Sequence, residues 1–492
     1  MRKHVTRTYH GGQGIVTKFS EHFGLGRSQN ELDFVDVLLE TDALLFIDPF
    51  AISQRTNRWS QEAHGLLLGF FQRVVDSIRE GRDGEARRLL SGLHEPNETR
   101  LGYSSRRPQG AGIGRMQANQ LLEALRESSA VRTGFLSSLE ECELMIDGIG
   151  SDKISDLTTN IIRGMLVEYT VQQCELHGVP THRVALPPRF SLETCSWVSE
   201  YADVPLADSK PILLVPKAIV RYEPAYNHQH YYRHFVLEFL QVEHLAAGSA
   251  LVHALKNGSR RVYKNDLQAI HPCTKEFLFE FSREHPEVLE AYRHHLAQLE
   301  QRGLQSQVAE EDECVIAAAL RAALSSIAPG GASASDYHRL MIGVVEFLFF
   351  PVLTSPRKEL EIHKGRKRID IVMENSAAEG AFYNLHAVKK LPSAYVAIEC
   401  KNYSTDVANP ELDQLSGRFS PNRGKIGFMC CRTFENRQLF VERCRDTLRD
   451  DRGLILALDD ARIDSMLGLV EAGNRRFLDS KIVKLVDEVW LA

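Results

Sequence analysis

The segment AYVAIECKNY (residues 394–403) constrains the fold of this chain more than any other. Its apolar residues are typical of a strand buried on both faces, yet Glu399 and Lys401 interrupt them. Because side chains alternate along a strand, both charges point to the same face. Burying a carboxylate and an ammonium group costs desolvation free energy, so the two need a partner, a metal ion or a chemical role. We therefore expect a functional site where this strand ends.

A second apolar segment, RIDIVMEN (368–375), contains one acid near its start, Asp370. If this segment pairs with residues 394–403, Asp370 and Glu399 converge and can bind one hard divalent cation, Mg²⁺ or Mn²⁺. Water and a phosphate oxygen would complete the coordination of the cation. Such a site suits phosphodiester hydrolysis, in which Lys401 orients the attacking water or stabilises negative charge on the phosphate.

Two predicted helices add polar residues to this region. Glu346 interrupts the apolar sequence GVVEFLFF and could supply another carboxylate. In NPELDQLSGRF, Asn409 is a capping residue, Pro410 takes the first helical position, and Gln414 lies one turn further on. We expect Gln414 to face the end of the strand that carries Glu399.

The order of elements indicates an α/β fold with a mixed sheet. The sequence APGGASAS (328–335) breaks the helical pattern before it and marks a domain boundary. After this break we predict a helix at 336–350, strands at 358–363, 368–374 and 394–402, a helix at 410–418, a strand at 425–431, a helix at 435–449 and a strand at 453–458.

Residues 336–460 resemble the PD-(D/E)XK nuclease superfamily, which has the restriction-endonuclease-like fold, and especially its Mrr-like and Holliday-resolvase-like branches. The resemblance implies that Asp370, Glu399 and Glu346 bind the metal ion, that Lys401 is the catalytic lysine, and that Gln414 is auxiliary. Two features depart from the family pattern. Residue 369, before the aspartate, is Ile where the pattern has Pro, and the stretch 375–393 is longer than a simple hairpin.

A basic segment precedes the predicted site. RKELEIHKGRKR (357–368) contains six basic residues and two acids, whereas the whole chain has 59 Lys and Arg against 65 Asp and Glu, a net charge of −6. This balance argues against a general basic coat for nucleic acid, so if the protein binds a polyanion the positive charge must be local. We expect the basic side chains next to Asp370 to contact phosphate, the alternative being a solvated turn. They are Lys364, Arg366, Lys367 and Arg368.

At about 150 residues per domain, 492 residues predict about three domains. We assign 1–240 to an N-terminal α/β recognition or regulatory domain, 241–330 to a helical connecting region and 331–492 to the nuclease domain. Residues 1–330 resemble only a family without an assigned function. Within them, Lys217 and Arg221 either bind an anionic ligand or pair with acids, and the sequence leaves this open. Helices are predicted at 60–80, 115–128, 231–244 and 284–302, and a capped helix of about 20 residues is predicted within 146–180, after its opening Gly turns. Strands are predicted in LLFID (44–48) and PILLVPKAIVRYEP (211–224).

These observations predict a cytoplasmic, Mg²⁺-dependent endonuclease that cuts DNA. A large second part fused to such a domain is similar to bacterial anti-phage defence and restriction proteins. The alternatives are a structure-specific repair or recombination nuclease, an RNase, and a catalytically silent nucleic-acid-binding adaptor. Double-strand cleavage would require a homodimer or larger assembly, and the N-terminal part would bind a protein partner or trigger. Neither a membrane span, a secretory signal nor a C-x-x-C pair is recognised.

Overall fold

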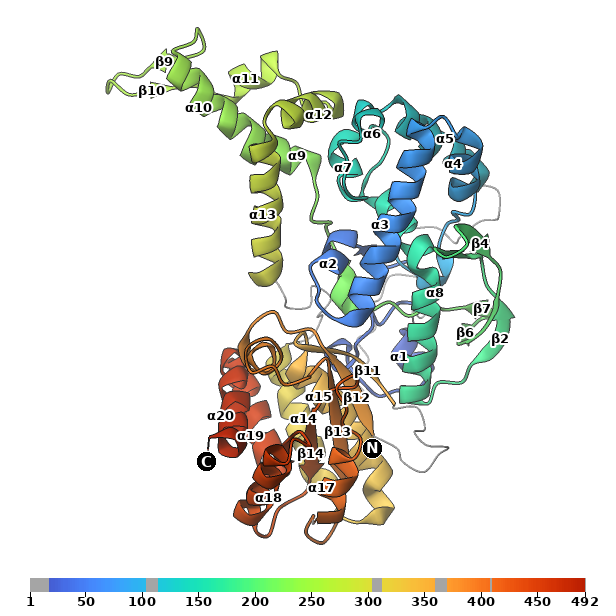
Figure 1. The fold of residues 1–492 in the computed structure, drawn as a ribbon, viewed down its shortest axis with the longest axis vertical. Coiled ribbons are helices and arrows are strands. Elements are labelled where there is room, and N and C mark those ends of the chain that lie inside the picture. The colour runs from blue at the N-terminus through green and yellow to red at the C-terminus, as the bar shows by residue number, and fades with distance from the viewer. Residues whose placement is uncertain (1–16, 103–113, 303–311, 359–369, 408, 492) are drawn as a thin grey trace, which may run out of the picture.

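The computed structural model describes residues 17–102, 114–302, 312–358, 370–407 and 409–491. Two large hydrophobic cores organise them. The first core contains residues from Phe19 to Leu296, and the second contains Leu176 together with residues from Ile316 to Val489. Figure 1 shows the N-terminal region above the C-terminal region, with a helical arm projecting at the top.

A five-stranded mixed sheet forms the centre of the C-terminal region. The strands stand in sequence order; β11, β12 and β13 are antiparallel, and β13, β14 and β15 are parallel. The parallel strands are continuous apolar runs because helices cover both faces of the sheet. The bounds are β11 Leu353–Arg357, β12 Ile371–Asn375, β13 Tyr395–Lys401, β14 Ile426–Cys431 and β15 Leu454–Asp459.

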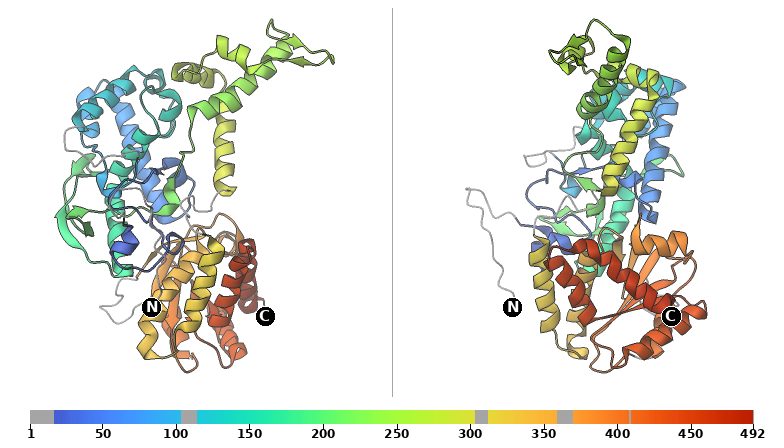
Figure 2. Two further views of the ribbon diagram at one scale, coloured as in Figure 1. Left: turned by 180° about the vertical axis from the view of Figure 1, so that it is seen from behind. Right: turned by 90° about the vertical axis from the view of Figure 1, so that its left-hand side faces the viewer.

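Helices pack on the two faces of this sheet. On one face α15 (Ala334–Phe349) places the ring of Phe349 5.3 Å from that of Phe428. On the opposite face Leu415 of α17 (Asn409–Ser416) packs against Gly427. Figure 1 looks at the side of α17, and the left view of Figure 2 looks at the side of α15. The remaining helices are α14 Glu313–Ser326, α16 Gly380–Tyr383, α18 Arg437–Arg449, α19 Asp460–Glu471 and α20 Leu478–Trp490.

Helices also dominate the N-terminal region. The predicted helices at 60–80, 115–128 and 146–180 are confirmed as α3, α5 and α8. The described helices up to residue 177 are α1 Phe19–His22, α2 Pro49–Ser53, α3 Arg58–Arg79, α4 Asp83–Leu90, α5 Gly114–Glu127, α6 Ser129–Thr133, α7 Cys142–Met145 and α8 Ser151–His177.

The strands of this region are shorter than predicted. Of LLFID, only β1 (Phe46–Ile47) is a strand, and 211–224 contains only the end of β7 (Lys210–Pro211) and β8 (Val220–Arg221). Helix side chains satisfy buried backbone groups here, since Thr170 Oγ1 of α8 accepts from Leu214 N at 2.9 Å. The other strands are β2 His182–Ala185, β3 Arg189–Ser191, β4 Ser196–Val198, β5 Tyr201–Val204 and β6 Leu206–Ala207.

The arm consists of residues 228–302. The helix predicted at 231–244 is α9 (His228–Tyr231), a π-helical turn and α10 (Leu237–Ala247), and the helix predicted at 284–302 is α13 (Pro286–Arg302). Between them lie β9 His253–Ala254, β10 Arg260–Arg261, α11 Lys264–Ile270 and α12 Lys275–Glu284. No helix in the described ranges has both the length and the apolar character needed to cross a membrane.

The cores divide before the predicted break at 328–335. Helix α14, which the sequence analysis assigned to the connecting region, lies in the C-terminal core, and its Arg321 pairs with Asp464 of α19 at 2.7 Å. The first described strand of the sheet is β11, which ends at Arg357, just before the predicted strand at 358–363. That prediction lies almost wholly outside the described residues.

Candidate functional site

Asp370 and Glu399 lie on neighbouring strands. In the antiparallel pair β12–β13 Ile371 is opposite Ile398, so Asp370 comes opposite Glu399 one step further along. The Asp370 carboxylate accepts a hydrogen bond from the backbone N–H of Cys400 at 2.7 Å. The strand pairing on which the predicted site depends is therefore present.

Three donors surround the Glu399 carboxylate, which is only 1% exposed. Lys401 Nζ lies 2.7 Å from Oε1, and Gln414 Nε2 donates to the same oxygen at 3.1 Å. Arg418, a buried residue just after α17, binds Oε2 through Nη1. The predicted residues Asp370, Glu399, Lys401 and Gln414 thus come together.

The charges at this site influence one another. Burial raises the pKa of Glu399, as does the nearby Asp370 carboxylate, while Lys401 and Arg418 oppose the shift. Burial alone would lower the pKa of Lys401, but the Glu399 carboxylate outweighs it and the pKa is raised. Lys401 is therefore held as a cation beside the two acids, where it can stabilise developing negative charge.

Glu346 is not part of this arrangement. It lies on the side of α15 that faces the N-terminal region, where its Oε1 is 4.0 Å from His177 Nε2. Burial raises the pKa of Glu346 to about 8, partly offset by Arg27. Among the described residues neither carboxylate oxygen has a hydrogen-bond partner. The predicted role of Glu346 as a third metal ligand therefore lacks the required proximity, because the sequence cannot show which way each side of a largely buried helix faces.

Two residues near the site were missed by the sequence analysis. His338, two turns before Glu346 on α15, hydrogen-bonds to the backbone of Asp370, and burial lowers its pKa against the effect of the Asp370 carboxylate. Arg418 lies four residues after Gln414, a spacing that places both on one side of a helical turn. That spacing was the available signal for Arg418. No comparable pattern distinguished His338.

The donor set of the site is small. Nowhere in the described ranges do three or more His, Cys, Asp or Glu side chains gather in a way that could hold a metal ion. Asp370 and Glu399 supply two carboxylates. The predicted phosphate contacts Lys364, Arg366, Lys367 and Arg368 lie outside the described residues.

Charged groups in the N-terminal region have internal partners. Lys217 is buried and hydrogen-bonds to the carbonyl of Asn30 at 3.3 Å, with Asp33 acting to keep it charged. Arg221 pairs with Asp48 at 3.2 Å and also with Glu300. Of the choice that the sequence left open, Arg221 pairs with acids, whereas Lys217 is held by backbone carbonyl groups.

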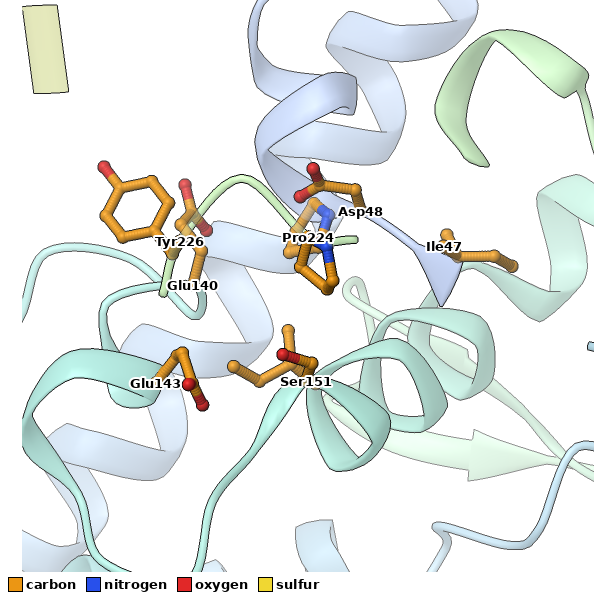
Figure 3. Close-up of a pocket in the computed structure, with 9 residues that line it drawn as sticks. Ile47, Asp48, Glu140, Glu143, Ser151, Pro224 and Tyr226 are labelled. Carbon is orange, nitrogen blue, oxygen red and sulfur yellow. The ribbon is translucent and has the colours of Figure 1, made fainter. Parts of the chain in front are cut away.

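One small cavity in this region is lined by acids. Figure 3 shows Asp48 from one segment of the chain, Glu140 and Glu143 from a second, and Pro224 and Tyr226 from a third. Burial raises the pKa of Glu140 to about 7. The cavity volume is about 10 Å³, enough for about one water molecule. We assign this cavity a structural role.

Comparison with known families gives a match in the N-terminal region. Residues 24–227 match the family model of a domain of unknown function, DUF8370. No curated protein and no solved structure matches the chain. The matched residues end before the arm and do not include Asp370, Glu399 or Lys401.

Proposed function

We propose that the C-terminal region is a restriction-endonuclease-like domain that hydrolyses phosphodiester bonds in DNA with the help of Mg²⁺ or Mn²⁺. The observation that carries the proposal is the group formed by Asp370, Glu399 and Lys401. Two acids and an ammonium group gather at the end of strands that are otherwise apolar. Their desolvation is costly, and chemistry explains their presence better than packing does.

The order of elements supports the same proposal. A helix, three antiparallel strands, a helix and a parallel strand occur in this order as α15, β11 to β13, α17 and β14, with the short helix α16 and a π-helical turn between β12 and β13. This is the order that the family resemblance implies. Asp370 directly precedes the second strand, and Glu399 and Lys401 lie at the end of the third, which supports the proposal.

The carboxylates of Asp370 and Glu399 fit a hard divalent cation, because Mg²⁺ in proteins is commonly held by one or two carboxylates plus water and substrate phosphate. When bound, such an ion would polarise the phosphate and make a water molecule more acidic. Glu399 is already satisfied by protein donors, so binding of the ion must loosen at least one of its contacts with Lys401, Gln414 and Arg418.

The chain's own residues then have distinct tasks. Lys401, released from Glu399 Oε1, would move its charge to the phosphate oxygen or to the attacking water. Arg418 and Gln414 fix the rotamer of Glu399 from opposite oxygens. His338 orients the backbone at Asp370. Each of these side chains already lies next to the group on which it would act.

In the cell we propose a role in bacterial anti-phage defence or restriction, acting on DNA in the cytoplasm as a homodimer or larger homo-oligomer. The large N-terminal region would bind a protein partner or trigger. Repair or recombination cleavage and RNA cleavage are the alternatives within the same chemistry. The adaptor alternative is disfavoured by the ion pair of Glu399 with Lys401, which a silent protein has no need to keep.

The test is cleavage of plasmid, single-stranded DNA and RNA by the purified chain with Mg²⁺, Mn²⁺, Ca²⁺ or EDTA. We expect cleavage with Mg²⁺ or Mn²⁺ and none with EDTA, and a loss of ~10²-fold or more in Asp370→Asn, Glu399→Gln and Lys401→Met. Asp413→Asn is the matched control, because Asp413 is an exposed acid next to Gln414 that pairs only at the surface. Normal cleavage by all three folded site variants would refute the proposal.

A further inference from the structure

The C-terminal sheet and the N-terminal region share a buried hydrogen-bonding contact at Glu374. This residue lies on β12, four positions after Asp370 and therefore on the same face of the strand. Its Oε2 accepts from Asn57 Nδ2 at 3.2 Å and from the backbone N–H of Trp59 at 3.3 Å. Glu374 and Asn57 are both buried.

The contact completes the start of helix α3. Asn57 is the N-cap residue of this 22-residue helix, yet its side chain makes no capping hydrogen bond. The first backbone N–H groups of a helix need acceptors, and the positive end of its dipole favours an anion. The carboxylate of Glu374, which belongs to the C-terminal region, supplies both the acceptor and the negative charge.

A second contact holds the neighbouring strand. The pairing of β11 with β12 shifts register between Thr354 and Arg357, and within the shift Ser355 has a left-handed φ of 51°. Asp33 accepts from the Ser355 backbone N–H at 3.1 Å and from the Tyr169 hydroxyl at 2.7 Å. The irregular part of β11 is therefore bound to the N-terminal region at a buried carboxylate.

Gln173 of α8 adds a third hydrogen bond, from its Nε2 to the carbonyl of Pro356 at 2.8 Å. The three contacts fall on β11 and β12, and the described side chains give no comparable buried bond from this region to β14 or β15. β12 begins directly after Asp370, and Glu374 is about 13 Å along the strand from it, at about 3.3 Å per residue.

We propose that Asn57 and Asp33 are positioning residues for the candidate site, and that the region matching the domain of unknown function holds β11 and β12 in the alignment that places Asp370 beside Glu399. The effect on cleavage rests on the proposed function, whereas the effect on the strands does not. Displacements of about 1 Å in a catalytic group can reduce a rate ~10²-fold, so contacts remote from the chemistry can matter for it.

The test uses the full chain and the variant Asn57→Asp, which keeps the shape of the side chain but turns the donor toward Glu374 into a second acid. Asn227→Asp is the matched control. Asn227 is the N-cap of α9 in the arm, where it accepts a hydrogen bond from His230 N, and an Asp can do the same. Hydrogen exchange measured by mass spectrometry and cleavage kinetics are the two readouts.

In Asn57→Asp we expect faster exchange in peptides covering 353–357 and 371–375, with 426–431 and 454–459 unchanged. We also expect kcat to fall ~10-fold or more with little change in KM. The double variant Asn57→Asp/Glu374→Gln should restore both readouts, because the new amide can donate to the new carboxylate. This rescue distinguishes positioning from general loss of folding.

Unchanged exchange in β11 and β12 would overturn the inference, as would faster exchange with unchanged kcat or failure of the double variant to restore either readout. A chain that cleaves nothing before any substitution contradicts the proposed function alone. In that case, exchange and rescue still decide whether the N-terminal region holds the two strands.

Discussion

Glu399 and Glu346 lie on elements of the same core, β13 and α15, and are equally buried, each 1% exposed, but their surroundings differ. At the end of β13, Lys401, Gln414 and Arg418 surround the Glu399 carboxylate. On the face of α15 toward the N-terminal region, the Glu346 carboxylate has no hydrogen-bond partner among the described residues. Burial of an acid therefore does not identify its role, whereas the groups that surround its carboxylate do identify it.

Among the substitutions that test this contrast between the two acids, Arg418→Ala should have the largest effect on stability. Removing one member of a buried ion pair leaves the other charge uncompensated, so we expect a loss of about 3–5 kcal/mol of stability, measured by chemical denaturation. Arg452→Ala is the control, because its pair with Asp413 is largely exposed and should contribute about 0–1 kcal/mol. Equal losses in the two variants would mean that the Glu399 network is not a compensated charge cluster.

Glu346→Gln should have the opposite sign. The amide has nearly the shape of the carboxyl group but carries no charge that burial can destabilise, so we expect a gain of about 1–3 kcal/mol at pH 9. Glu399→Gln is the counterpart in the other cluster and should destabilise. If both substitutions change the melting temperature in the same direction, the contrast between the two acids is wrong.

The pH dependence sharpens this point. Because burial raises the pKa of Glu346 from 4.5 to about 8, the folded protein retains a proton that the unfolded chain loses. The stabilising contribution of this group is complete below about pH 4.5 and is lost as the pH rises through about 8. Melting curves of the unaltered chain and Glu346→Gln should therefore diverge between pH 5 and pH 8. A constant difference would contradict the raised pKa.

Other groups that face Glu346 also titrate, but they are present in both chains and drop out of the difference between them. Burial lowers the pKa of His177 from 6.5 to about 3, so its contribution to stability rises with pH up to about 6.5, opposite in direction to that of Glu346. Burial lowers the pKa of Lys217 to about 8, so its titration affects stability above that pH, where its contribution increases with pH. Asp33, Glu31 and Arg27 complete the charged surroundings.

The smallest expected effect is on DNA binding and comes from the basic residues before Asp370. If Arg366 and Lys367 contact phosphate, neutralising both should weaken DNA binding for all sequences and reduce the salt dependence of binding by roughly 1–2 in log–log slope. Binding measured at several salt concentrations with Ca²⁺ would test this. An unchanged slope would indicate a solvated turn.

Much of the C-terminal fold was predictable, because its strands are long apolar runs and its helices have clear boundaries. The interruption of such runs by Asp370, Glu399 and Lys401 also marked the candidate residues. Glu346 gave the same signal for a different reason: it interrupts an apolar helix that a second region covers. A single sequence shows that a charge is buried, but it does not show what lies opposite.

The N-terminal region was less predictable for a related reason. Its apolar segments form two-residue strands because hydroxyl groups of α8 satisfy neighbouring backbone groups, as Ser155 does for Ile47 N at 2.9 Å. Such pairings join residues about a hundred positions apart and leave no periodic pattern. The contacts of Glu374 with Asn57 and Trp59 are equally non-local.

The capping of α3 by Glu374 limits how freely the two regions can be exchanged. A chimaeric protein that joined the N-terminal region to another sheet would leave the first turn of α3 without its acceptor. A new N-terminal region would leave the buried Glu374 carboxylate without its two hydrogen-bond donors and with only the 3.9 Å ion pair to Arg357 of β11. Residues 57 and 374 must therefore change as a pair. In related sequences we expect an acid at 374 to accompany a side-chain donor at 57, with both replaced together when either is lost.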